Sequence, residues 1–294
     1  MAEHELIWKG TSSRNLGVHI ISEPPYDIAE PSVTANHVLG RNGDILTEVY
    51  DFANSERSYQ MTFELNGQPF NQRCIEVMNW LCADYMEHGS HTYSRLEDSY
   101  DTNIYYLASF KPGGEMQKAL GSNTSLGSYT AVFNRRPERF YKSGSIAQTG
   151  TIPTEAPQPT FNNPTMFASY PTIEITVPAG VVEGCVEINH WGRSMYSEYV
   201  YRIVVSNSSS DEQYLTIDGL NHTISTSANA LNYRIFARQP VPFDNDNMDY
   251  NKFYENAEIL FWPGPNTFES VRFREGGTKA TGLTYRVIPN WWTL

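Results

Sequence analysis

Hydrophobic and polar residues alternate with a period of two in many short runs of this chain. The runs MTFEL at 61–65 and IEITV at 173–177 are the clearest. Such alternation is typical of antiparallel strands that turn one face to a core and the other to water. Gly, Pro, Asn or Ser bounds each run, as expected where strands end in turns. The strands predicted in this way are 58–65, 103–110, 128–133, 172–177, 185–191, 199–205, 214–217, 233–237, 257–262 and 283–288.

One segment, 71–85, has the helical period instead. Its apolar stripe consists of Cys74, Val77, Leu81 and Tyr85, with Ile75, Met78 and Cys82 beside it. The pattern predicts an amphipathic helix that packs on a sheet. A cofactor-binding stripe is the alternative, but no ligand-type spacing accompanies the apolar residues.

The segment TGTIPTEAPQPTFNNPT at 149–165 contains four prolines and no apolar periodicity. Because proline fixes φ and favours extended backbone, the segment is interpreted as a semi-rigid linker. The predicted fold is therefore mainly β with one helix. It consists of an N-terminal α+β domain at 1–148, a β-sandwich plus the helix, followed after the linker by an all-β sandwich at 166–294.

The charge balance narrows the classes of partner. The chain has 33 acidic and 21 basic residues, a net charge of −12, so a nucleic-acid backbone would be repelled on average. A basic cluster of Arg135, Arg136, Arg139 and Lys142 is interpreted as solvated or as a contact with a protein partner. The 19 tyrosines suit contact surfaces, because tyrosine offers an apolar ring with a polar tip. The composition favours a binding protein or a structural protein.

Cysteine usage and the N-terminus favour a protein made in a reducing cytoplasm. Cys74 and Cys82 fall in the predicted helix, where eight residues of rise hold them roughly 12 Å apart, too far for a disulfide. An odd cysteine count favours reduced thiols. The opening MAEHELIWKG lacks the apolar core of a signal peptide, and no later run is long enough to span a bilayer.

The stretch GRNGDIL at 40–46 could be a phosphate loop, a cation loop or a turn. It lacks the Lys-Ser/Thr pair of a phosphate loop, and no helical pattern follows it. Asn-Gly between strand-forming residues favours a type I′ hairpin, since both central residues of that turn need positive φ. We therefore predict a hairpin turn at Asn42 and Gly43 with a polar tip that includes Arg41 and Asp44.

No catalytic, cofactor or metal residues are predicted. The acidic segment 244–255 places Asp244 and Asp246 at positions 1 and 3 of a calcium-loop template, but Asp249 replaces the required glycine. This excludes an EF-hand and leaves an irregular calcium site open against a solvated acidic loop. His88 and His91 suggest no third or fourth zinc ligand.

Two sugar-related interpretations remain open at this stage. Paired carboxylates for glycoside cleavage could come from any of the acidic residues. Tryptophans could stack on sugar rings or belong to the core, and the candidates are Trp191, Trp262, Trp291 and Trp292.

In order and spacing, the motifs resemble the distal tail proteins of long-tailed phages with non-contractile tails. The first-domain pieces are GRNGDIL, like the family's Gly-Arg-(Asn/Asp)-Gly signature, MTFELN, the helix ending near NWLCADY, YDTNIYYLASF, like its Asp-x-x-x-Tyr-Tyr strand, and GSYTAVFNRRPERFY. The second-domain pieces are PTIEITVPAG, LTIDGLNHTIS, LFWPGPNTFES and RVIPNWWTL. The second-domain matches are the looser ones.

The resemblance implies a structural virion protein at the tail tip, with a galectin-like second domain. First domains would close into a homohexameric ring between the tail tube protein and the tail-associated lysin or tip protein, with Arg41, Asp44, Arg135, Arg136 and Arg139 as inter-subunit contacts. Second domains would point outward for host attachment, through receptor-binding proteins or through sugar or partner contacts at Trp191, Trp262, Asp244 and Asp246. The alternative is a carbohydrate-binding module. No enzyme activity, cofactor, nucleic acid or membrane insertion is implied.

Overall fold

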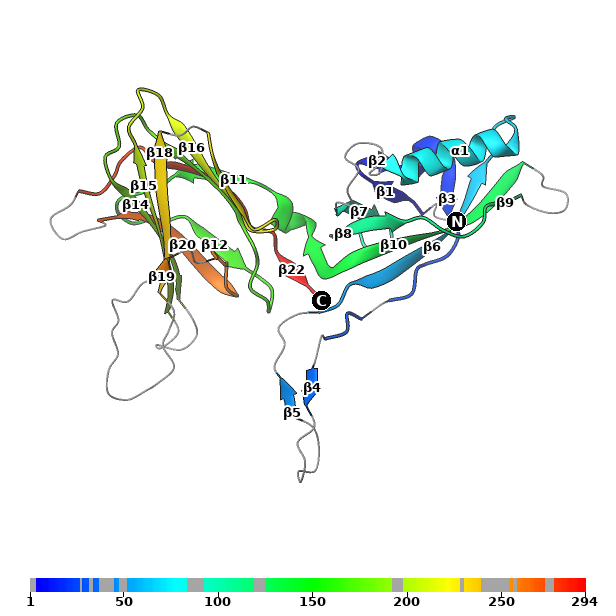
Figure 1. Ribbon diagram of the computed structural model, residues 1–294, viewed down its shortest axis with the longest axis horizontal. Coiled ribbons are helices and arrows are strands. Elements are labelled where there is room, and N and C mark those ends of the chain that lie inside the picture. Colours follow the sequence, from blue (N-terminus) through cyan, green and yellow to red (C-terminus); the bar gives the residue numbers. More distant parts are fainter. Residues whose placement is uncertain are drawn as a thin grey trace. The chain divides into compact units, whose positions relative to one another are not determined.

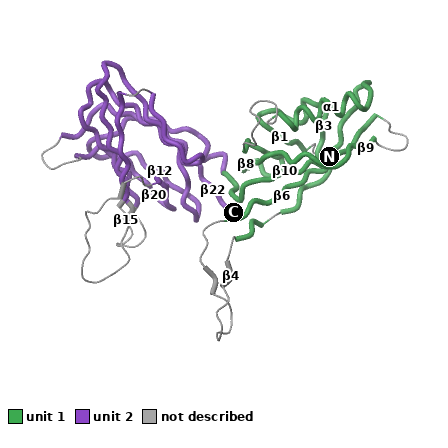
Figure 2. Tube along the Cα trace, viewed as in Figure 1, with its two compact units in different colours: residues 1–140, 294 green, residues 141–293 purple. Residues whose placement is uncertain are grey.

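The structure is a computed structural model that describes residues 4–26, 28–31, 34–36, 45–47, 52–83, 93–118, 125–191, 198–227, 230–238, 254–255, 258–272 and 278–294. The chain divides into two compact units, residues 1–140 with Leu294 and residues 141–293 (Figure 2). Each unit has its own β-sheet framework (Figure 1).

The first unit is built on one antiparallel sheet with the order β2-β1-β7-β8-β10-β6-β3, and β9 also pairs with β10. Its strands are β1 (Leu6–Trp8), β2 (Thr11–Ser12), β3 (Val18–Ile20), β6 (Ser55–Glu64), β7 (Ser94–Asp98), β8 (Ile104–Lys111), β9 (Gln117–Lys118) and β10 (Leu126–Tyr141). The longest ladder joins β6 to β10 from Glu64↔Leu126 to Ser55↔Arg135. Inward residues of β6 alternate with exposed or half-buried ones, as the period-two pattern predicts.

The single α-helix among the described residues, α1 (Phe70–Leu81), packs on this sheet (Figure 1). The Trp8 indole donates to the Leu81 carbonyl at 3.2 Å, and the Phe63 and Phe70 rings stack. Val77 and Leu81 of the predicted stripe are buried, whereas Ile75 beside it is 60% exposed. The expected helix on a sheet is confirmed for 70–81, and Tyr85 lies outside the described residues.

A short hairpin flanks the GRNGDIL stretch. β4 (Thr34–Asn36) pairs antiparallel with β5 (Ile45–Thr47), with Asn36 opposite Ile45. A two-residue turn at Asn42 and Gly43 would place Gly40 opposite Ile45. The residue opposite Ile45 is Asn36 instead, so the observed pairing is shifted by four residues from the pairing that this turn requires. Antiparallel strands on either side of the stretch are confirmed, whereas Asn42 and Gly43 lie outside the described residues and their two-residue turn stays a prediction.

The second unit is a sandwich of two antiparallel sheets. One sheet has the order β11-β21-β13-β16-β17 and the other β12-β20-β14-β15-β18-β19. The strands are β11 (Gln148–Thr151), β12 (Thr160–Asn163), β13 (Thr172–Val177), β14 (Gly184–Trp191), β15 (Glu198–Asn207), β16 (Gln213–Asp218), β17 (Thr223–Thr226), β18 (Leu231–Arg238), β19 (Tyr254–Glu255), β20 (Gly264–Val271) and β21 (Thr284–Ile288). The remaining short elements of the chain are two 3-10 turns, η1 (Ser13–Leu16) and η2 (Lys142–Ser145), and the strand β22 (Trp292–Thr293).

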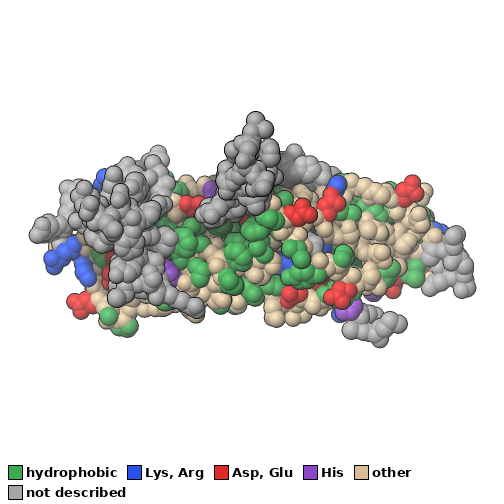
Figure 3. Space-filling view, turned by 90° about the horizontal axis from the view of Figure 1, so that it is seen from below, with side chains coloured by type: hydrophobic (Ala, Val, Ile, Leu, Met, Phe, Trp, Pro, Cys, Tyr) green, Lys and Arg blue, Asp and Glu red, His purple; other side chains and the backbone are tan. Residues whose placement is uncertain are grey.

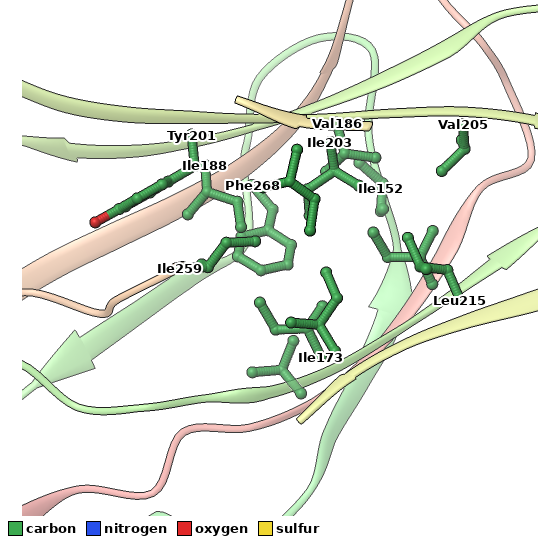
Figure 4. Packing of buried hydrophobic residues seen from close by; sticks show 14 of the residues in the cluster. Ile152, Ile173, Val186, Ile188, Tyr201, Ile203, Val205, Leu215, Ile259 and Phe268 are labelled. Atoms are coloured by element: carbon green, nitrogen blue, oxygen red, sulfur yellow. The ribbon is translucent and has the colours of Figure 1, made fainter. Parts of the chain in front are cut away.

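Inward side chains of both sheets form one core in the second unit (Figure 4). Ile173 comes from one sheet and Val186, Ile203 and Phe268 from the other, and each is almost completely buried. This interdigitation between facing sheets is what aligned sandwiches require. The predicted class is confirmed: mainly β, with one helix in the first unit and an all-β sandwich in the second.

Two sequence predictions are corrected here. The interpretation of 149–165 as a linker is wrong, because β11 pairs with β21, β12 pairs with β20, and Ile152 and Phe161 are buried in the core. The prolines between β11 and β12 therefore lie in a segment that belongs to the sandwich and is not a free linker. The predicted strand at 257–262 is also wrong for 258–262, where Phe261 makes only an isolated bridge with Ser169, and the regular strand β20 follows it.

Buried asparagines fasten the irregular segments of the second unit. The Asn207 amide donates to the carbonyls of Val177, Pro178 and Asp211, and its oxygen accepts from Ser209. The amide of the completely buried Asn266 likewise accepts from the Trp262 backbone N–H and donates to the Trp262 carbonyl. Since buried polar groups need partners, each amide replaces ladder hydrogen bonds that the bends interrupt.

Candidate functional site

The basic stretch of β10 lies largely inside the first unit. Arg135 is completely buried, and its Nη1 donates to the carbonyls of Arg136 and Pro137 at 3.0 and 3.1 Å. Arg136 holds Glu138 through two hydrogen bonds of 3.0 and 3.2 Å. Arg139 is also buried and lies 3.7 Å from the ring centroid of the exposed Tyr26. The Arg135 side chain therefore supports the fold and is not at the surface of the chain.

The centre of this buried charge is Asp98, at the end of β7. Its Oδ2 accepts hydrogen bonds from Arg57 Nη2 at 3.0 Å and from the Tyr59 hydroxyl at 2.7 Å. Its Oδ1 accepts from the backbone N–H groups of Tyr100 and Asp101. Burial alone would lower the pKa of Arg57, but Tyr59, Tyr106 and Asp98 raise it, so the guanidinium stays charged.

The tyrosines of the YDTNIYYLASF motif extend the same cluster. The guanidiniums of Arg57 and Arg135 lie 4.9 and 5.2 Å from the Tyr106 ring centroid. Arg95 lies 4.1 Å from the Tyr105 ring, whose phenol pKa burial raises to about 12. Cation–π contacts of this kind hold guanidiniums in a partly desolvated site. The motif therefore acts as a structural element around the buried arginines.

The tryptophans that could have bound sugar have other neighbours. Trp262 packs against the core of the second unit, and its indole donates to the Tyr201 hydroxyl at 3.1 Å. Trp291 and Trp292 are buried, and the Trp292 indole donates to the Ala168 carbonyl at 2.9 Å. Trp191 ends β14 opposite Glu198. The side chains of Trp262, Trp291 and Trp292 therefore take part in packing and internal hydrogen bonds.

A pocket of about 370 Å³ lies in the second unit between the end of β16, strand β17 and strand β18. Ile217, Ile235 and Ile259 form its apolar part, and His222 and Glu258 face each other at 2.5 Å on its rim. Sequence reasoning missed this pocket, because its lining comes from segments up to about forty residues apart that carry no motif.

Several candidate residues fall outside the described part of the chain. These are Arg41, Asp44, His88, His91, Asp244 and Asp246. Among the described residues, no three metal-ligating side chains gather in one place. No helix in the described ranges is long and apolar enough to cross a membrane.

The described cysteines are unpaired, as the sequence predicts. Burial raises the pKa of Cys185 to about 12, so this thiol stays protonated at neutral pH.

On the face drawn in Figure 3, acidic side chains are scattered among apolar and polar ones. This distribution agrees with the acidic composition.

His190 gives the second unit a pH dependence. The ring is buried and its Nδ1 lies 3.0 Å from the Pro265 carbonyl. Burial lowers the pKa of His190 below its usual 6.5, although the Pro265 contact raises it in part. The unfolded state then binds the proton more tightly, so this contribution to stability is complete above about pH 6.5 and is lost as the pH falls.

We therefore expect the wild-type chain to lose more unfolding free energy between pH 7.5 and 5.5 than His190→Gln does. The difference should be at most about 1.4 kcal/mol, since pH 5.5 is one unit below the unfolded pKa. Urea unfolding of both proteins at the two pH values measures it. Equal losses in the two proteins would contradict the lowered pKa.

No protein-family model matches the sequence, and no curated protein matches it either. Solved structures are similar over the full length. The SPP1 Dit protein, described as a paradigm of the hub adsorption apparatus in phages infecting Gram-positive bacteria, matches with a TM-score of 0.58 at 12% identity, over 99% of both chains. A chain of the phage P2 baseplate in its activated conformation with Ca has a TM-score of 0.45 at 9% identity, over 98% of both chains. The chain thus has, along its whole length, the fold of the SPP1 Dit hub protein.

Proposed function

We propose that this protein is a structural hub of a phage tail tip or baseplate. The observation that carries the proposal is the fold match to SPP1 Dit over 99% of both chains, which includes both units. The motif order in the sequence supports the same proposal independently of the fold. The protein would then be a virion component made in the cytoplasm of the host bacterium.

In this proposal the first units of six copies close into a ring. The ring joins the tail tube protein to the tail-associated lysin or tip protein, and the second units face outward for receptor-binding proteins or host attachment. A ring needs a heterologous interface, in which two different patches of the chain meet around an axis. Exposed apolar side chains on the first unit, Ile21, Tyr26 and Ile28, are suited to such a patch.

A catalytic role is not part of the proposal, nor is sugar binding by the tryptophans. Those of the candidate tryptophans whose side chains are described are buried or packed against the core. Arg41 and Asp44 stay proposed as inter-subunit contacts. If charge reversal at Arg41 leaves ring assembly and stability unchanged, their stretch is only a turn.

The oligomeric state of the full chain tests the proposal. Light scattering and mass photometry are expected to give a hexamer of fixed stoichiometry at micromolar concentration, or on addition of the tube and tip proteins. A matched Ile21→Asp, Ile28→Asp variant, which replaces two exposed side chains, should stay monomeric with an unchanged melting temperature. A wild-type chain that is monomeric at every concentration, and stays so with both partners added, would sink the proposal.

A further inference from the structure

Strand β17 is a free edge of its sheet within the described part of the second unit. It is the last strand in the order β11-β21-β13-β16-β17, and no described strand pairs with its other side. The pocket described above opens directly beside this edge, and Ile224 of β17 is among its lining residues. The edge strand β17 therefore lies directly beside an apolar pocket.

The backbone of β17 points hydrogen-bonding groups outward at this edge. Ser227 N donates to the Tyr214 carbonyl at 2.9 Å, which fixes the phase of the β16–β17 ladder. Bonded pairs alternate in an antiparallel ladder, so the N–H and C=O groups of Ile224 and Thr226 point away from β16. These groups are a template on which another extended chain can pair.

The pocket supplies a place for the side chain of such a paired chain. Ile217, Ile235 and Ile259 are at most 6% exposed, whereas Ile224 and Tyr233 at the entrance are about 40% exposed. Ile224 lies opposite Ile217 in the ladder, so both side chains stand on the inner face of the sheet. A strand added to β17 would direct every second side chain to this face and over the pocket.

The charges around the pocket favour a basic partner. Asp218 and Glu258 contribute two carboxylates to the lining, with His222 and Arg234 as the basic groups. His222 contacts Glu258 and also the Tyr170 ring. With a neutral histidine the lining has one excess negative charge, in a chain whose net charge is −12. Lysine or arginine beside the inserted side chain would therefore be attracted.

We propose that the edge of β17 binds an extended segment of a partner protein by strand addition. The segment carries an apolar side chain that enters the pocket and basic residues that lie beside Asp218 and Glu258. Main-chain hydrogen bonds to Ile224 and Thr226 supply part of the affinity, and the pocket supplies the specificity. This inference goes beyond the hub function and does not depend on it.

The test uses the full chain and a fluorescein-labelled nine-residue peptide with lysine at both ends and alternating threonine and leucine between them. Fluorescence anisotropy is expected to show saturable binding, and backbone NMR shifts should centre on Ile224 and Thr226. Thr226→Pro removes the outward N–H without breaking a hydrogen bond to β16, so we expect at least about tenfold weaker binding. The matched control Thr226→Ala should bind within about twofold of the wild type.

A peptide control keeps the test decisive if Thr226→Pro lowers the melting temperature. N-methylation at alternate residues blocks one edge of the peptide, so one methylated series should lose binding while the other retains it. The proposal is overturned by absence of saturable binding at millimolar peptide, or by equal affinity of both methylated series and of Thr226→Pro. It is also overturned if N-acetylglucosamine oligomers, rather than the peptide, shift the pocket amides.

Discussion

Asp98→Ala is expected to lower the unfolding free energy of the first unit by about 3 to 5 kcal/mol. The carboxylate is buried and holds the buried Arg57 guanidinium, the Tyr59 hydroxyl and two backbone N–H groups. Its removal leaves a buried positive charge without its anion, and buried donors without an acceptor. The loss therefore exceeds the value of the ion pair itself.

Chemical unfolding of the full chain, with hydrogen exchange of the β6, β7 and β8 amides to isolate the first unit, measures this loss. The matched control is Glu56→Ala, which removes an exposed ion pair with Lys111 on the same sheet and should cost at most about 1 kcal/mol. Adding Arg57→Met to Asp98→Ala should recover part of the loss, because the two side chains are coupled. A cost for Asp98→Ala no greater than that of the control would show that water replaces the carboxylate.

The period-two pattern predicted most of the long strands because burial alternates along them. Strand β13 has the predicted bounds, 172–177, and its residues alternate between the core and partial exposure. β12 was missed because Phe161 is the one large apolar residue in a four-residue strand between prolines. In such a segment the pairing with β20 supplies the structure, and that pairing cannot be seen in the local sequence.

The buried charge cluster and the pocket could not be predicted from the sequence for a similar reason. Arg57 and Asp98 are 41 positions apart, on strands β6 and β7 that are not neighbours in the sheet, so no local pattern could indicate their contact. A run such as Arg135 and Arg136 looks solvated in sequence, because arginines are usually exposed. The tyrosines of β8 are the signal that could have indicated burial, since aromatic rings commonly accept guanidiniums on their faces.

The same dependence on distant neighbours leads to the expectation for Asn266. Its Nδ2 donates to the carbonyls of Phe161, Trp262 and Gly264 at 2.9 to 3.2 Å, and its Oδ1 accepts from Trp262 N at 3.1 Å. The side chain is completely buried, so truncation leaves these backbone groups without a partner inside the second unit. We expect Asn266→Ala to cost about 3 kcal/mol or more in unfolding free energy.

Asn266→Asp should cost at least as much, because a carboxylate cannot donate to the three carbonyls and its charge would be buried. The matched control is Asn162→Ala on the neighbouring strand β12, where the side chain is exposed and the cost should stay within about 0.5 kcal/mol. Chemical unfolding, with hydrogen exchange of the β14 and β20 amides as the local readout, separates the three variants. If the Asn266→Ala chain is as stable as the control, a water molecule replaces the hydrogen bonds of the amide. The buried asparagines would then not be what holds the irregular segments in place.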